Sequence, residues 1–155
     1  MTDKTFLEEA VALAQENVKS GGRPFGAVLV REGRVIARAV NRMVEDNDPT
    51  AHAELLALRR AGEALRSDRL DGCTVYASGQ PCPMCLAAMR MAGISEVVYA
   101  YSNETAAPYG LSTAAIGDEL AQPLEKQDWA RIRHQPPQGE DAPALYEAWT
   151  ARKKR

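Results

Sequence analysis

Apolar positions in the first forty residues follow a helical spacing and then change to strand patterns. Four apolar residues are separated by four, three and four positions: Leu7, Val11, Ala14 and Val18. This spacing predicts an amphipathic helix, which the glycines at positions 21 and 22 would end. Residues 27–30 form a continuous apolar run, which is typical of a strand buried on both faces. A polar turn at 31–34 and a second strand at 35–41 complete a predicted hairpin.

Helical and strand patterns alternate along the middle of the chain. Residues 47–50, Asn-Asp-Pro-Thr, combine polar capping residues with a proline, which predicts that a second helix starts near residue 51 and stops at Gly62. The further expected elements are a strand, a helix, a strand and two helices, at 73–78, 82–92, 96–101, 114–120 and 143–152. This order favours the α/β class, with helices on both faces of a central mixed sheet. The length fits a single domain over 1–155.

Composition and charge exclude several classes of protein. The 155 residues are 45% hydrophobic and 26% charged, which is average for a globular domain and unlike a disordered or fibrous chain. No apolar run approaches the ~18 residues of a membrane-spanning helix, and the first residues lack the pattern of a secretory signal, so we expect a cytoplasmic protein. A net charge of −2 gives little attraction to nucleic acid, which is therefore not an expected partner.

The three cysteines point to a metal site or a redox pair rather than to a disulfide framework. Cys82 and Cys85 lie three positions apart where a helix is expected to begin, so both would occupy one helical face. Free amides and the helix dipole at that position favour the thiolate form that a metal requires. Together with His52 they make a ligand set suited to zinc, and three protein ligands with an open fourth position are typical of a catalytic zinc.

Glu54 adds a candidate proton shuttle. It lies two residues after His52, roughly 200° around a helix, and is therefore better placed beside the metal than on it. Two thiolates formally cancel the charge of zinc and weaken its pull on water. A carboxylate that accepts a proton from water and delivers it to the leaving group supplies what the metal lacks. This chemistry suits hydrolysis at an amidine-like carbon with loss of ammonia.

Four segments carry a resemblance to a known family: 24–27 (Pro-Phe-Gly-Ala), Asn41, 48–54 (Asp-Pro-Thr-Ala-His-Ala-Glu) and 81–85 (Pro-Cys-Pro-Met-Cys). They resemble the cytidine/deoxycytidylate deaminase superfamily and are most similar to the bacterial guanine deaminases. The resemblance is specific over about residues 5–101 and loose afterwards. It implies a three-layer α/β/α fold, one catalytic Zn²⁺ per subunit and a homodimer. By position, His52, Cys82 and Cys85 would bind zinc and Glu54 would shuttle the proton.

The resemblance also implies three substrate contacts. Asn41 would hydrogen-bond the substrate base, Ala53 would contribute a backbone amide to the same pocket, and Phe25 would help to line it. The expected function is that of a zinc-dependent hydrolytic deaminase. Its substrate would be a free amino-substituted nucleobase, guanine or a close relative.

Three departures from the guanine deaminase pattern weaken the assignment to guanine. Residues 110–113, Gly-Leu-Ser-Thr, stand where those enzymes carry Gly-Phe-Asp-Asp, whose aspartate contacts the base. Gln80 stands where a glutamate usually precedes the proline of the cysteine motif. The chain ends in Arg-Lys-Lys-Arg at 152–155, whereas a C-terminal tyrosine can reach the active site in similar bacterial enzymes. A ring N–H left without its carboxylate partner would be recognised much less well, although the reaction class is unaffected.

Several alternatives remain open at the level of sequence. The same motifs fit deamination of another ring, such as a nucleoside, cytosine or a triazine, or of adenosine in a tRNA anticodon loop. A thiol–disulfide oxidoreductase using Cys82 and Cys85 would belong to a different class of function. A structural zinc site would need a fourth ligand, for which Cys73 and His134 are candidates. Cys73 fits a small core residue better, and His134 fits an exposed loop.

Overall fold

The computed structural model describes residues 2–139 and 143–153. Its internal contacts divide the chain into two compact units, Met1–Ala121 and Gln122–Arg155. The first unit contains the sheet, the helices packed on it and the residues predicted to bind zinc, to shuttle the proton and to contact the substrate. Among its described residues, the second unit has a 3-10 turn, Leu124–Lys126, and one helix, α6 (Ala144–Lys153).

A four-stranded mixed sheet forms the centre of the first unit. Its strands are β1 (Gly26–Arg31), β2 (Arg34–Val40), β3 (Cys73–Gly79) and β4 (Glu96–Tyr101), in the order β2-β1-β3-β4. β1 runs antiparallel to both β2 and β3, whereas β3 and β4 are parallel. The predicted hairpin and the predicted mixed sheet are confirmed.

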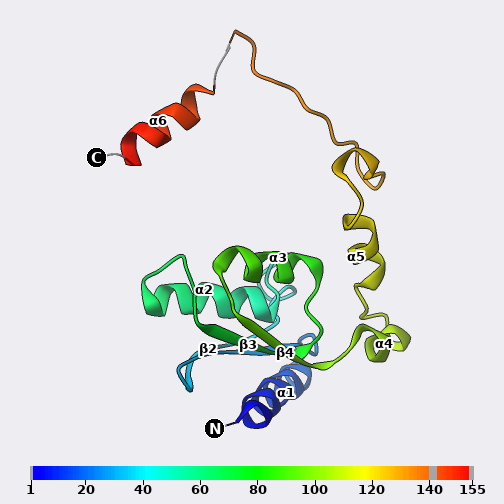
Figure 1. Cartoon of the computed structure of the whole chain (residues 1–155). Helices are drawn as coiled ribbons and strands as arrows, with labels where there is room; N and C mark the ends of the chain where they lie inside the picture. The colour runs from blue at the N-terminus through cyan, green and yellow to red at the C-terminus, as the bar shows by residue number, and fades with distance from the viewer. Residues whose placement is uncertain (1, 140–142, 154–155) are drawn as a thin grey trace. The chain divides into compact units, whose positions relative to one another are not determined.

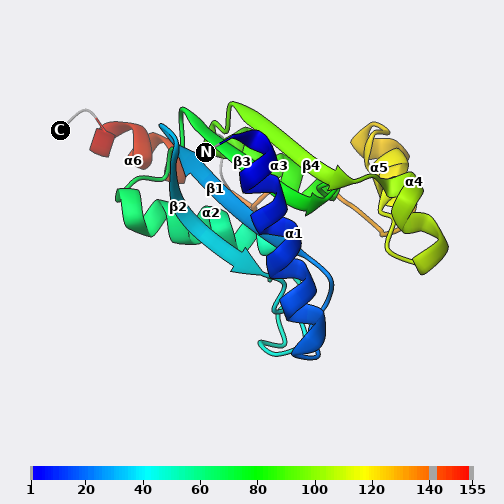
Figure 2. The ribbon, with the colours of Figure 1, turned by 90° about the horizontal axis from the view of Figure 1, so that it is seen from below.

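Helices cover both faces of this sheet, which confirms the expected three-layer arrangement. Helix α1 (Asp3–Lys19) packs on β1 and β3 from one side, and α2 (Ala53–Leu65) and α3 (Pro83–Ala92) lie next to each other on the other side (Figure 1). Seen from below, α1 crosses in front of the sheet (Figure 2). Because side chains alternate along a strand, β1 supplies both layers.

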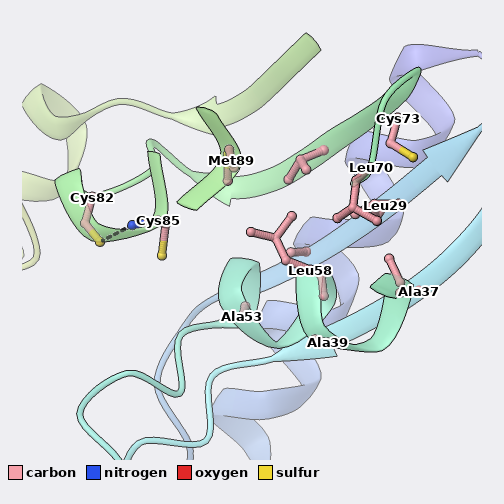
Figure 3. Packing of buried hydrophobic residues seen from close by; sticks show 14 residues of the cluster. Leu29, Ala37, Ala39, Ala53, Leu58, Leu70, Cys73, Cys82, Cys85 and Met89 are labelled. Atoms are coloured by element: carbon pink, nitrogen blue, oxygen red, sulfur yellow. Dashed lines mark hydrogen bonds between the residues drawn. The ribbon is translucent and has the colours of Figure 1, made fainter. Parts of the chain in front are cut away.

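The two layers have separate apolar clusters. Ala27 and Leu29 of β1 pack with α2 and α3, whereas Val28 and Val30 pack with Phe6 of α1. Figure 3 shows the larger cluster, in which Cys73 lies at the opposite end from Cys82 and Cys85. Cys73 is fully buried there, as expected of a small core residue.

Three short elements follow β4 before the end of the first unit. They are α4 (Asn103–Ala106), a 3-10 turn (Ala107–Tyr109) and α5 (Ala114–Leu120). The predicted helix at 114–120 is confirmed, and the predicted terminal helix corresponds to α6. Within the described part of the chain, no helix is both long and apolar enough to span a membrane.

The bounds predicted for α2 were wrong at both ends. The helix begins at Ala53 rather than near residue 51, because the Asp48 side chain accepts hydrogen bonds from the backbone N–H and the hydroxyl of Thr50. Asp48 therefore closes a turn of its own instead of capping the helix. The helix continues through Gly62 to Leu65 and ends on Arg66 in the left-handed conformation.

Candidate active site

The three candidate zinc ligands come from the first turns of two adjacent helices. His52 is the N-cap residue of α2, Cys82 is the N-cap residue of α3, and Cys85 lies in the first turn of α3. His52 Nδ1 lies 3.4 Å from Cys82 Sγ and 3.5 Å from Cys85 Sγ. The three ligand atoms are all within 4.8 Å of one another. Two motifs far apart in sequence thus meet at one point of the fold.

The spacing of these atoms fits a tetrahedral zinc ion. Bond lengths of ~2.0 Å to nitrogen and ~2.3 Å to sulfur separate the N and S ligands of such an ion by roughly 3.6 Å. The observed separations of 3.4 and 3.5 Å are close to that value. Two thiolates and one imidazole are also a donor set that zinc accepts. Among the described residues, no further histidine, cysteine or carboxylate belongs to this group, so a fourth position would remain for water or substrate.

Hydrogen bonds within the group stabilise a thiolate at the start of α3. The pKa of Cys82 is lowered to about 4, because the Cys85 thiol, the His52 ring and the backbone N–H of Cys85 donate hydrogen bonds to its sulfur. The last of these bonds is drawn in Figure 3. The same contacts raise the pKa of Cys85 and of His52, which both act as donors to Cys82. A cation bound at this point would take the place of those protons.

Glu54 lies beside the ligand group rather than within it. Glu54 stands in the first turn of α2, two positions after His52, and is 6% exposed. Burial raises the pKa of the Glu54 carboxyl, because the charged form loses its hydration. A carboxyl group in such a place can exchange a proton with a water or an amine held nearby.

A cavity of about 150 Å³ opens onto these residues. His52, Cys82 and Glu54 contribute to its lining. Gln80 and the whole segment 110–113 line it as well. The segment in which the sequence departs from the guanine deaminase pattern is therefore a wall of the same cavity.

Two of the three predicted substrate residues reach this cavity. Asn41 and Phe25 line it, and Asn41 is 2% exposed. The Asn41 side-chain oxygen accepts a hydrogen bond from the backbone N–H of Met43 at 3.0 Å. Its backbone oxygen accepts one from the side chain of Asn17 at 3.0 Å, which fixes Asn41 against the end of α1. Ala53 is completely buried and lies outside the lining, and its role stays a prediction.

The sequence reasoning missed two residues of the lining, Arg23 and Met43. The Arg23 guanidinium contacts the Met43 sulfur at 3.4 Å, although twenty positions separate them. Neither residue belongs to a motif or to a periodic pattern, but each stands two positions from a predicted pocket residue, Arg23 from Phe25 and Met43 from Asn41, and that proximity could have identified them. His134 is exposed in the second compact unit, as predicted.

Comparison with known proteins gives a family and several relatives. Residues 1–101 match the model of the cytidine and deoxycytidylate deaminase zinc-binding region. The chain is 44% identical over 128 residues to guanine deaminase of Bacillus subtilis, a match that covers 82% of each chain. It is also 46% identical over 100 residues to a tRNA-specific adenosine deaminase of Agrobacterium fabrum, over 64% of this chain and 66% of that one.

A solved structure extends the similarity to nearly the whole chain. The X-ray structure of Bacillus subtilis guanine deaminase matches with a TM-score of 0.87 and 40% identity, over 97% of this chain and 95% of that chain. The residues of the family match include all three candidate ligands, Glu54 and Asn41. The chain therefore belongs to the cytidine and deoxycytidylate deaminase family, the family defined by this zinc-binding region.

Proposed function

We propose that the chain is a zinc-dependent hydrolytic deaminase that releases ammonia from a free amino-substituted nucleobase, guanine or a close relative. One observation carries the proposal: a single cavity collects two of the zinc-ligand residues, a buried carboxyl group and a buried carboxamide. Its volume of about 150 Å³ lies below the ~300–1,000 Å³ of pockets for drug-sized ligands, which favours a free ring over a nucleotide.

The proposed chemistry assigns each residue one task. His52, Cys82 and Cys85 would hold zinc, which when bound supplies a Lewis acid that makes an attacking water more acidic. Glu54 would accept a proton from that water and return it to the amino nitrogen. The carbon gains an oxygen and loses its bond to nitrogen, and ammonia leaves. Glu54 is buried and lines the same cavity as His52 and Cys82, as this role requires.

The ring itself would be held by Asn41, with Phe25 and the backbone amide of Ala53 as further contacts. Because the Asn41 oxygen accepts a bond from Met43, its side-chain NH₂ would be the group offered to an acceptor atom of the ring. Phe25 would contribute an apolar surface against which a planar base can pack.

A second candidate is deamination of adenosine in a tRNA anticodon loop. The 46% identity to the Agrobacterium fabrum tRNA-specific enzyme favours it, but that match covers only 64% of this chain. The match to guanine deaminase covers 82% of this chain. The net charge of −2 also favours a free base, because a groove that binds nucleic acid is expected to be basic. We therefore place the free base first.

We further propose that residues 1–155 act as one deaminase domain with one zinc per subunit, and that the protein is a cytoplasmic homodimer. The single ligand group among the described residues supports one zinc. Large exposed apolar side chains in both compact units, among them Tyr101, Tyr109, Trp129 and Trp149, provide surface that a second copy could cover. Light scattering tests the dimer: a monomer mass at working concentration would contradict it.

The function is tested by ammonia release from the zinc-loaded full chain. The panel contains guanine, guanosine, cytosine, cytidine, adenine, adenosine, ammeline and a tRNA anticodon stem-loop, with Cys85→Ala as the blank. Turnover of guanine or another free ring supports the proposal. Turnover of the stem-loop alone would establish the second candidate instead. A protein without stoichiometric zinc, in which Cys82 and Cys85 oxidise reversibly, would be the oxidoreductase.

A further inference from the structure

One wall of the substrate cavity is a segment without helix or strand. Residues 110–113 connect the 3-10 turn Ala107–Tyr109 to α5, and all four line the cavity. The segment is bonded to the chain that precedes it at both ends. The backbone N–H of Leu111 donates to the Ala106 oxygen at 3.3 Å, and that of Thr113 donates to Asn103 Oδ1 at 3.3 Å. Both bonds hold the wall to α4: Ala106, its last residue, binds Leu111, and Asn103, its first residue, binds Thr113.

Asn103 is in turn bonded to the loop that carries the cysteine motif. Its backbone N–H donates to Gln80 Oε1 at 2.9 Å. The backbone N–H of Gln80 donates to the Tyr101 oxygen at 2.8 Å, so Gln80 is fixed to the end of β4 by its main chain as well. Gln80 lies two positions before Cys82. A continuous series of hydrogen bonds therefore joins the candidate metal motif, through Gln80 and Asn103, to Thr113.

We infer that Gln80 and Asn103 are positioning residues that set the distance between the 110–113 wall and the zinc-ligand group. The inference rests on the proposed function, since it concerns how a ring is held at that zinc. The series has two acceptor atoms, Gln80 Oε1 and Asn103 Oδ1, and each satisfies a backbone N–H of the next segment. Removing either acceptor deletes one hydrogen bond of the series and should loosen the Thr113 end of the wall, while every candidate ligand and Glu54 stay unchanged.

The two residues differ in a way that separates positioning from direct contact. Gln80 lines the substrate cavity and could also touch a ring, whereas Asn103 is absent from its lining and lines a neighbouring cavity of about 340 Å³. An effect of Asn103 on a ring bound in the substrate cavity would therefore pass through the wall. A role of Gln80 through its Oε1 acceptor would be kept by glutamate, which has the same acceptor but lacks the NH₂ donor.

The experiment compares kcat and KM for the best substrate of the panel in zinc-loaded wild type and in five variants. Gln80→Leu and Asn103→Ala each remove one acceptor, and we expect KM to rise by about three- to tenfold with kcat within about twofold of wild type. Gln80→Glu and Asn103→Asp keep the acceptor and should restore KM. The double variant Gln80→Leu/Asn103→Ala should raise KM no more than the larger single effect, because both act through the same wall.

A second readout does not depend on turnover. The amides of Asn103 and Thr113 should exchange with solvent faster in Gln80→Leu than in wild type, with Gln80→Glu as the matched control and zinc content unchanged. Amide exchange in Gln80→Leu that is equal to or slower than in wild type would overturn the inference. An unchanged KM in the single variants would also overturn it, as would a double variant whose KM effect is the product of the two single effects, or a Gln80→Glu variant that does not restore KM. If wild type deaminates nothing on the panel, the proposed function fails, and the exchange rates alone decide the positioning role. If Gln80→Leu does not fold, the amide exchange rate of Thr113 is compared between Asn103→Ala and Asn103→Asp, and faster exchange in Asn103→Ala supports the positioning role.

Discussion

Replacement of Glu54 by glutamine separates catalysis from metal binding more sharply than any other single change. The two side chains have nearly the same shape, but the amide cannot accept and return a proton. Because Glu54 is outside the group of three ligand atoms, Glu54→Gln should retain zinc at the wild-type stoichiometry. General acid–base groups contribute about 10²–10⁴-fold in rate, so kcat should fall by that factor, equivalent to roughly 3–5 kcal/mol of the barrier.

The burial of Glu54 predicts an opposite effect on stability. The residue is 6% exposed, and burial raises the pKa of its carboxyl, which means that the charged form is disfavoured by the fold. A neutral amide of the same size removes that cost, so the free energy of unfolding should stay the same or rise. Loss of activity together with unchanged or increased stability is the signature of a functional carboxyl group.

The assay measures ammonia release, zinc content and urea unfolding of Glu54→Gln beside Glu63→Gln. Glu63 lies in the same helix and is exposed, and its amide variant should match wild type in all three measurements. Turnover of Glu54→Gln near the wild-type rate would refute the proton-shuttle role. Loss of zinc from Glu54→Gln but not from Glu63→Gln would instead make Glu54 part of the metal site.

Three further predictions concern stability and metal. Gly26→Ala places a methyl group 2.4 Å from the backbone oxygen of Ala10 in α1. Urea unfolding should therefore show a loss of about 1–3 kcal/mol or more, whereas Gly117→Ala, whose methyl group has its nearest contact at 3.7 Å, should leave stability unchanged. Burial and the hydrogen bond to Asp3 raise the pKa of Tyr76 to about 12. Because the unfolded chain releases this proton at lower pH, the free energy of unfolding should fall as pH rises from about 10 to about 12, and Tyr76→Phe should lack that part of the fall. Chelation of zinc should abolish turnover, lower the unfolding temperature and expose two further thiols to a thiol reagent, all reversed by added zinc; unchanged thiol reactivity would contradict ligation by the cysteine pair.

Several structural features that depend on neighbouring residues could be predicted from the sequence. The apolar run of β1 predicted a strand covered on both faces, and all of Gly26–Val30 are buried. The start of α3 was predicted within one residue, because Cys82 caps it and a proline occupies its first turn. The three predicted ligands, His52, Cys82 and Cys85, lie together at two helix starts, and their binding of zinc stays a prediction.

Two kinds of feature could not be predicted from the sequence: the choice between competing polar contacts within a short segment, and contacts between distant segments. The start of α2 was misplaced because the Asp48 side chain bonds Thr50, a choice between two polar contacts that composition does not decide. The contact between Arg23 and Met43, which both line the cavity, joins residues twenty positions apart and was likewise not predicted. The same reasoning applies to Asn103, whose part in the cavity wall is visible only through its bond to Thr113.

This difference explains why the reaction is better determined than the substrate. The reacting centre is built from two helix starts, each a short contiguous motif, and the fold has only to bring the two together. The cavity proposed for the ring, in contrast, is lined by residues 110–113, which a series of hydrogen bonds links through Asn103 to Gln80. A change in that series can shift the wall without disturbing the metal group. Substrate preference within such a scaffold can therefore change through residues that touch neither the zinc nor the ring.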